Sequence, residues 1–142
     1  GLLTVCEGNR VDYSQGTDWF VQMQQEFKID PIYVGYDRAL AGYWVDEMKS
    51  NGFQMEAVAQ GPYTWSQPMR EMGAAFADKK VNYNNNPILK WCLTNTAVKK
   101  SGLNNIQPVK INERRRIDGA VSLLNAWVLY VKYYEDFMYS VG

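Results

Sequence analysis

Apolar residues recur every three or four positions in several stretches of the chain, which predicts amphipathic helices with one buried face. The first helix is predicted from a cap at Ser14 to Phe27, and the segment 28–31 ends it because a residue before proline leaves the helical region. A second helix is expected to end at Asn51-Gly52. Its expected buried face consists of Leu40, Tyr43, Trp44 and Met48.

Three more helices are expected in the second half of the chain. One is predicted to begin at an N-cap on Ser66, with Pro68 in its first turn, where the missing N–H of proline is harmless. Another opens at Pro87, after the polar turn 81–86. The last helix begins near Asp118 and is expected to cover the sheet with its apolar face. That face consists of Ile117, Val121, Leu124, Val128 and Val131.

Short runs of β-branched and aromatic residues predict the strands. Residues 32–36 lead directly into Asp37, and residues 53–59 follow the second helix. This strand–helix–strand order implies a parallel pair with a right-handed crossover, so Asp37 should lie at the carboxyl edge of the sheet, where α/β proteins bind ligands. Residues 1–6 are expected to form a further strand, and residues 99–108 a hairpin or a mobile loop.

The composition narrows the chemistry that is available. A chain of 142 residues with 46% hydrophobic content fits one globular domain. It contains no histidine, which argues against structural zinc and against Ser-His or Cys-His enzymes. Any chemistry must therefore rest on carboxylates, lysines, arginines or hydroxyls. No apolar run approaches the length of a membrane span and no secretory signal is present, so we expect a cytoplasmic protein that has no membrane partner.

The net charge of zero hides a strongly basic segment at residues 79–116. This segment holds nine cationic residues against the single acid Glu113, so its net charge is +8 and that of the remainder is −8. Charge runs are more often solvated faces, but a block of this kind can also face a polyanion. The residues expected to hold DNA phosphates are Lys99, Lys100, Lys110, Arg114, Arg115 and Arg116.

Asp37 and Asp118 are candidates for a divalent-metal site, because hard cations prefer carboxylate oxygens. Each acid also has a purely structural interpretation. Aspartate is favoured at helix starts, so Asp118 could simply stabilise the first turn of its helix. On spacing alone, the structural interpretation is the stronger one.

The order of several short motifs favours the metal site over the structural interpretation. These motifs are Tyr36-Asp37-Arg38, Gln60-Gly61, Ser66-Gln67-Pro68-Met69, Asn86-Pro87-Ile88-Leu89-Lys90-Trp91, Thr94-Asn95, Lys110 and Ile117-Asp118-Gly119. From about Leu2 to Trp127, this succession resembles the C-terminal nuclease domain of tailed-phage terminase large subunits.

The resemblance implies an α/β fold of the ribonuclease H-like type, with a mixed sheet flanked by helices. It implies cleavage of concatemeric viral double-stranded DNA during packaging in the cytoplasm of the host cell. Three acids of the family bind two Mg²⁺ or Mn²⁺ ions, and Asp37 and Asp118 fall on the second and third of these acids. In the full-length context the resemblance implies the terminase small subunit and the portal protein as partners.

The resemblance is incomplete at the start of the chain. The first acid of the family lies on a strand that we expect upstream of Gly1, and neither Glu7 nor Asp12 is a good substitute for it. No Gly-x-x-x-x-Gly-Lys-Ser/Thr segment occurs, so we expect a single nuclease domain, residues 1–142, without the ATPase domain of the family. Two alternatives stay open. One is a non-catalytic DNA-binding or assembly module with the same fold, and the other is an unrelated α/β domain whose acids are helix caps.

Overall fold

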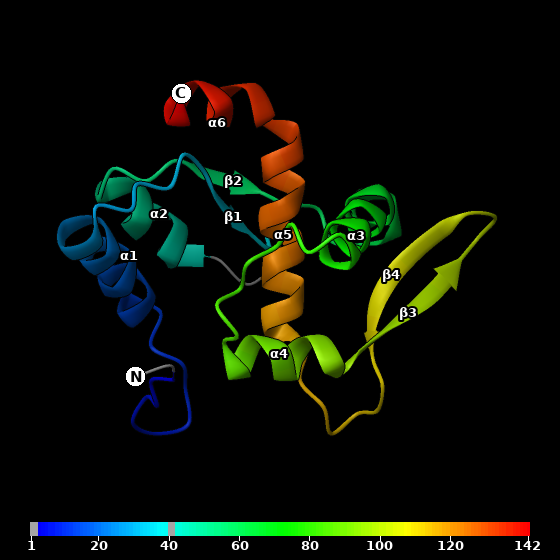
Figure 1. Cartoon of the computed structure of the whole chain (residues 1–142). Coiled ribbons are helices and arrows are strands. Elements are labelled where there is room, and N and C mark those ends of the chain that lie inside the picture. Colours follow the sequence, from blue (N-terminus) through cyan, green and yellow to red (C-terminus); the bar gives the residue numbers. More distant parts are fainter. Residues whose placement is uncertain (1–2, 40–41) are drawn as a thin grey trace. The chain divides into compact units, whose positions relative to one another are not determined.

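The structure is a computed structural model that describes residues 3–39 and 42–142. The chain divides into two compact units, Gly1–Ala57 and Val58–Gly142, and each is described by itself. Figure 1 shows the elements of both units along the chain. No helix among the described residues is long and apolar enough to cross a membrane.

The first unit contains two helices and one pair of parallel strands. Its elements are α1 (Ser14–Phe27), β1 (Val34–Tyr36), α2 (Gly42–Ser50) and β2 (Met55–Ala57). In the register of the pair, Val34 lies opposite Met55, and Tyr36 lies opposite Ala57. The parallel pair predicted from the strand–helix–strand order is confirmed, although both strands are shorter than expected.

A small apolar core holds the first unit together. Val34, Met48 and Phe53 are buried in it, and Phe20 and Trp44 pack against them from α1 and α2. The rings of Phe20 and Phe53 meet edge to face with their centroids 5.7 Å apart, a favourable geometry for aromatic pairs. The apolar stripe of α1 is therefore a packing surface, as its spacing predicts.

Three expectations for the first unit are wrong. Residues 3–6 form no strand, and residues 1–2 of that expected strand lie outside the described residues. Ser14 is the first residue of α1, not its cap, because Asp12 accepts hydrogen bonds from both the Ser14 N–H and hydroxyl. Tyr43 is 94% exposed, so it does not belong to the buried face of α2, and Leu40 lies outside the described part.

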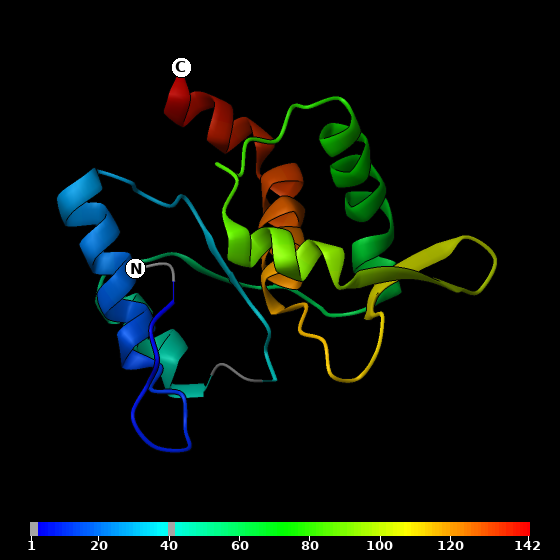
Figure 2. The same ribbon diagram turned by 60° about the horizontal axis from the view of Figure 1, so that its bottom comes forward.

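The second unit is built around helix α5, against which α3 and α4 both pack (Figure 2). Its elements are α3 (Pro62–Ala77), α4 (Pro87–Thr94), β3 (Thr96–Ser101), β4 (Asn105–Lys110), α5 (Asp118–Lys132) and α6 (Tyr134–Val141). Leu124 of α5 is almost completely buried against Trp65 and Met72 of α3. Burial of this apolar surface is the main stabilising contribution to the unit.

Helix α3 begins one turn earlier than predicted. Gly61 is its N-cap and Pro62 its first residue, a position that suits the fixed φ angle of proline. Ser66 is therefore not a cap but a buried residue of the second turn, and Pro68 lies inside the helix. The Ser66 hydroxyl accepts the backbone N–H of Ile106 at 2.9 Å, which joins α3 to strand β4.

The helix α5 begins at Asp118 as expected, and its first half is largely buried. The predicted face is wrong at its end, because Val131 is 44% exposed. Helix α6 was not expected. It follows a break at Tyr133, and its rings join a cluster of aromatic side chains that includes Trp127 and Tyr130 of α5. Tyr134 and Phe137 both meet Tyr130 edge to face.

The N-terminal turn of α5 approaches α4 closely at Gly119. A β-carbon added there would lie 3.1 Å from the Cys92 Sγ and 3.3 Å from the Cys92 Cβ. A larger residue there would force the Cys92 side chain to shift by a few tenths of an ångström, and packed interiors relax only partially around an added methyl group. Gly119 therefore fixes the start of α5, including Asp118.

We expect Gly119→Ala to lower the free energy of unfolding by about 1–3 kcal/mol through this overpacking. Gly73→Ala is the matched control, because a β-carbon on this exposed residue of α3 would meet no heavy atom within 4 Å. The control should raise the stability by up to about 1 kcal/mol, since alanine favours a helix interior over glycine. Urea unfolding measures both, and equal effects of the two substitutions would contradict the proposed contact.

Candidate functional site

Asp37 follows the last residue of β1, at the carboxyl end of the parallel pair. Its side chain is half-buried, and its Oδ1 accepts the N–H of Ala39 at 2.9 Å. A turn of this kind, in which an aspartate binds the backbone two residues later, holds the carboxylate in one orientation. Asp37 therefore lies where the sequence pattern places it within the first unit.

Asp118 is the first residue of α5, and its side chain is exposed. The N-cap is Ile117, which is buried and makes no side-chain capping bond. Within the described part of the chain, the Asp118 carboxylate forms no hydrogen bond and no ion pair. Asp118 is thus not a hydrogen-bonding cap, and its only structural contribution is a favourable charge beside the positive end of the helix dipole.

The two acids belong to different units, so each is placed only within its own unit. Among the described residues, no three acidic, cysteine or histidine side chains are grouped as a metal site. Both carboxylates are nevertheless oxygen ligands of the kind that Mg²⁺ and Mn²⁺ prefer. That Asp37 and Asp118 share a metal ion remains a prediction.

Asp12, which is a poor substitute for the first acid of the family, has a local role in the structure. The hydroxyl and the N–H of Ser14 stabilise its charged form and hold the pKa of the Asp12 carboxyl below its ordinary value. This carboxylate is therefore engaged at the start of α1.

The basic residues singled out in the sequence lie on one hairpin and on the loop that follows it. Lys99 and Lys100 are exposed on β3, and Lys110 is exposed at the end of β4. The residues Arg114–Arg116 lie in the exposed loop 111–116, directly before Ile117 and α5. None of the six cations forms an ion pair within the described residues. The second unit thus presents them to solvent, and Asp118 follows them in the chain.

A buried asparagine joins the two ends of the loop 111–116, and the sequence reasoning missed its role. Asn95, at the junction of α4 and β3, is only 3% exposed. Its side-chain N–H₂ donates to the Arg116 carbonyl at 3.1 Å, and its backbone carbonyl accepts the N–H of Ile111 at 3.0 Å. Asn95 thereby fixes both ends of the arginine loop. The Thr94-Asn95 motif was noted in the sequence, but its meaning required knowing that this junction is buried.

A second buried asparagine lies on α5, two helical turns after Asp118. The Asn125 Oδ1 accepts the indole N–H of Trp65 at 3.0 Å, and the Gln60 side chain donates to the same oxygen at 3.5 Å. A buried polar side chain is stable only with such partners. Asn125 therefore ties the segment before α3, and α3 itself, to α5. A polar residue within the apolar periodicity of α5 was the signal that could have revealed it.

Comparison with known proteins gives one family. The model of the family "Terminase large subunit, endonuclease domain" matches residues 1–132. The Escherichia coli K12 protein YmfN is 30% identical over 129 residues, which cover 89% of this chain and 28% of that protein. The chain therefore spans less than a third of the length of this curated relative.

The crystal structure of the large terminase of bacteriophage HK97 is similar to this structure, with a TM-score of 0.78 at 21% sequence identity. The match covers 90% of this chain and 27% of the HK97 chain. It bears out the expected fold class, an α/β fold of the ribonuclease H-like type. The chain belongs to the family of terminase large subunit endonuclease domains.

Proposed function

We propose that the chain is a divalent-metal-dependent endonuclease domain that cuts concatemeric viral double-stranded DNA during genome packaging. The observation that carries the proposal is the exposed Asp118 carboxylate, which has no partner within the described residues of a chain from an endonuclease family. A carboxylate that no internal donor satisfies is available to a cation. The DNA would be viral, and in a full-length terminase the small subunit and the portal protein would be further partners.

Asp37 and Asp118 are the proposed metal ligands and the proposed catalytic residues. Each adjoins or belongs to a regular element, since Asp37 directly follows β1 and Asp118 starts α5, so little chain entropy is lost when a cation binds. Bound Mg²⁺ or Mn²⁺ ions activate water, orient the scissile phosphate and stabilise the leaving oxygen. Of the three acids that the family resemblance implies, Asp37 and Asp118 match the second and the third. With only these two ligands matched, these 142 residues should bind metal weakly and cleave DNA poorly.

The exposed cations of the second unit are the proposed DNA-binding residues. They would neutralise phosphates and so position the duplex without selecting a base sequence. The six residues are Lys99, Lys100, Lys110, Arg114, Arg115 and Arg116.

A non-catalytic DNA-binding or assembly module is the second candidate. The observation that favours it is that all six exposed cations lie in the second unit and depend on no group of the Asp37 strand. Such a module would bind DNA without any divalent metal. A plasmid-nicking assay with and without Mn²⁺ separates the two candidates, because only the nuclease produces nicks that depend on the metal.

The first prediction concerns the acids. Calorimetry with Mn²⁺ should detect weak binding to the unmodified chain, and Asp37→Asn or Asp118→Asn should each abolish it, because the amide oxygen carries no charge. Asp46→Asn is the matched control on the exposed side of α2 and should leave the binding unchanged. If Asp118 only stabilises the helix N-terminus, Asp118→Asn will lower the melting temperature while the metal affinity stays the same. That result would refute the site assignment.

The second prediction concerns the lysines of β3. The logarithm of the affinity for duplex DNA should fall linearly with the logarithm of the salt concentration, at about −0.9 per phosphate contact. Replacing both Lys99 and Lys100 by alanine should make this slope shallower by about 1.8. The double variant Arg10→Ala and Lys49→Ala changes the net charge equally at exposed positions of the first unit and should leave the slope unchanged. Equal slopes for both double variants would show that only net charge matters.

A further inference from the structure

We infer that the β3–β4 hairpin is a minor-groove arm for duplex DNA, and that Leu103 at its tip enters between neighbouring base pairs. The inference rests on the proposed DNA binding of the second unit and adds to it a specific mode of contact. The tip of the hairpin projects beyond the helices of its unit in both views (Figures 1 and 2), and Leu103 at the tip is fully exposed.

The tip of the hairpin carries an unusual residue for a turn. Gly102 adopts a φ of +62°, as a tight turn requires, and Asn104 is also a typical turn residue, yet Leu103 between them is fully exposed. A single exposed leucine is common on protein surfaces and carries no meaning alone. Leu103, however, lies at the tip of a hairpin that carries exposed lysines. At this position an apolar side chain can be inserted between base pairs while the lysines contact the phosphates.

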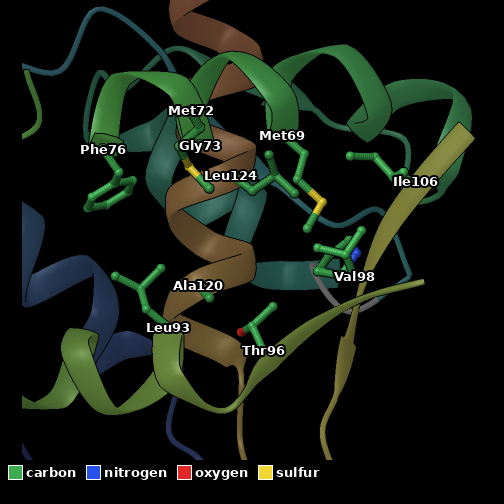
Figure 3. Close-up of a pocket in the computed structure, with 11 residues that line it drawn as sticks. Met69, Met72, Gly73, Phe76, Leu93, Thr96, Val98, Ile106, Ala120 and Leu124 are labelled. Carbon is green, nitrogen blue, oxygen red and sulfur yellow. The ribbon is translucent and has the colours of Figure 1, made fainter. Parts of the chain in front are cut away.

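The two faces of the hairpin differ in character. Val98 and Pro108 lie opposite each other, and Ile106 projects from the same face. These three side chains line an apolar cavity of about 240 Å³ together with residues of α3 and α5 (Figure 3). The other face carries Lys99 opposite Gln107. Part of the inner face thus lies against the body of the unit, whereas Lys100, which is opposite Ile106 on the same face, is exposed. The outer face and the tip also stay available to a ligand.

The hairpin is held against α3 close to its tip. The Ser66 hydroxyl accepts the Ile106 N–H, and the Arg70 guanidinium donates to the backbone carbonyl of Asn104, the residue directly after Leu103. These bonds order the distal half of the ribbon before any ligand arrives. An arm ordered in advance loses less conformational entropy on binding, which favours affinity.

The charges beside the tip suit the groove of a duplex. Lys99 and Lys100 are adjacent on β3, so their side chains leave opposite faces of the ribbon. The minor groove is about 6 Å wide in undistorted B-DNA, so a two-stranded ribbon must widen it on entering, and it then has one phosphate backbone on either side. Each lysine can therefore reach a different strand. Strand ribbons do bind DNA grooves in this way, and apolar side chains inserted into the minor groove unstack a base step and kink the duplex by about 20–90°.

The test uses the whole 142-residue chain and short duplexes labelled with a donor and an acceptor dye at their ends. The unmodified chain should bend the duplex and raise energy transfer. It should also bind a duplex with a central mismatch about tenfold more tightly than the matched one, because the mismatch is already partly unstacked. Leu103→Ala should lose both the bending and the preference for the mismatch, while the salt dependence of binding stays the same. Leu103→Phe, which keeps an apolar wedge, should retain them.

Tyr139→Ala is the control, because this exposed aromatic residue lies on α6, away from the hairpin in sequence and structure. It should behave like the unmodified chain. Salt-dependent binding without bending, or bending that Leu103→Ala leaves intact, would overturn the wedge and keep the proposed DNA surface. A Leu103 that contacts a protein partner instead would give that result. No binding of duplex DNA at low salt would refute the DNA surface itself, and the wedge with it.

Discussion

The packing of α3 and α4 against α5 is the interaction on which the second unit depends. Leu124 fills the centre of this contact, and Gly119 allows α4 to approach the first turn of α5. The start of α5 is therefore held by close-packed side chains, which deform little. Asp118 gains its fixed position from this packing, although its own carboxylate forms no hydrogen bond or ion pair within the described residues.

Two buried asparagines, Asn95 and Asn125, bind different irregular segments to these helices by hydrogen bonds. Asn95 binds the loop that carries the arginines, and Asn125 binds the segment that leads into α3. Each satisfies polar groups that would otherwise be buried without a partner, which would be unfavourable. Regular packing thus sets the frame of the unit, while specific hydrogen bonds place the exposed segments on it.

The positions of helices α1 to α5 and the parallel strand pair could be predicted from the sequence, because apolar periodicity and turn residues act locally, whereas helix α6 was not expected. The ends of elements could not be predicted. Ser14 and Ser66 could each cap a helix. Instead, the Ser14 hydroxyl donates a hydrogen bond to Asp12, and the Ser66 hydroxyl accepts one from Ile106 of strand β4. Val131 fits the apolar periodicity of α5, yet it is exposed, because burial also requires a neighbouring element that packs over that part of the helix. The positions of Asp37 and Asp118 within their elements were predictable, whereas the partners of Asn95 join residues far apart in sequence.

The two hydrogen bonds of Asn95 affect how the β3–β4 hairpin can vary in length among relatives. Both hydrogen bonds of Asn95 close the chain across the base of the hairpin, so strands β3 and β4 leave the body of the unit and return to nearly the same point. Lengthening a hairpin whose two ends are held together in this way costs little stability, because the entropy of loop closure rises only slowly with the number of residues. Relatives can therefore differ in the reach of this arm without moving the first turn of α5.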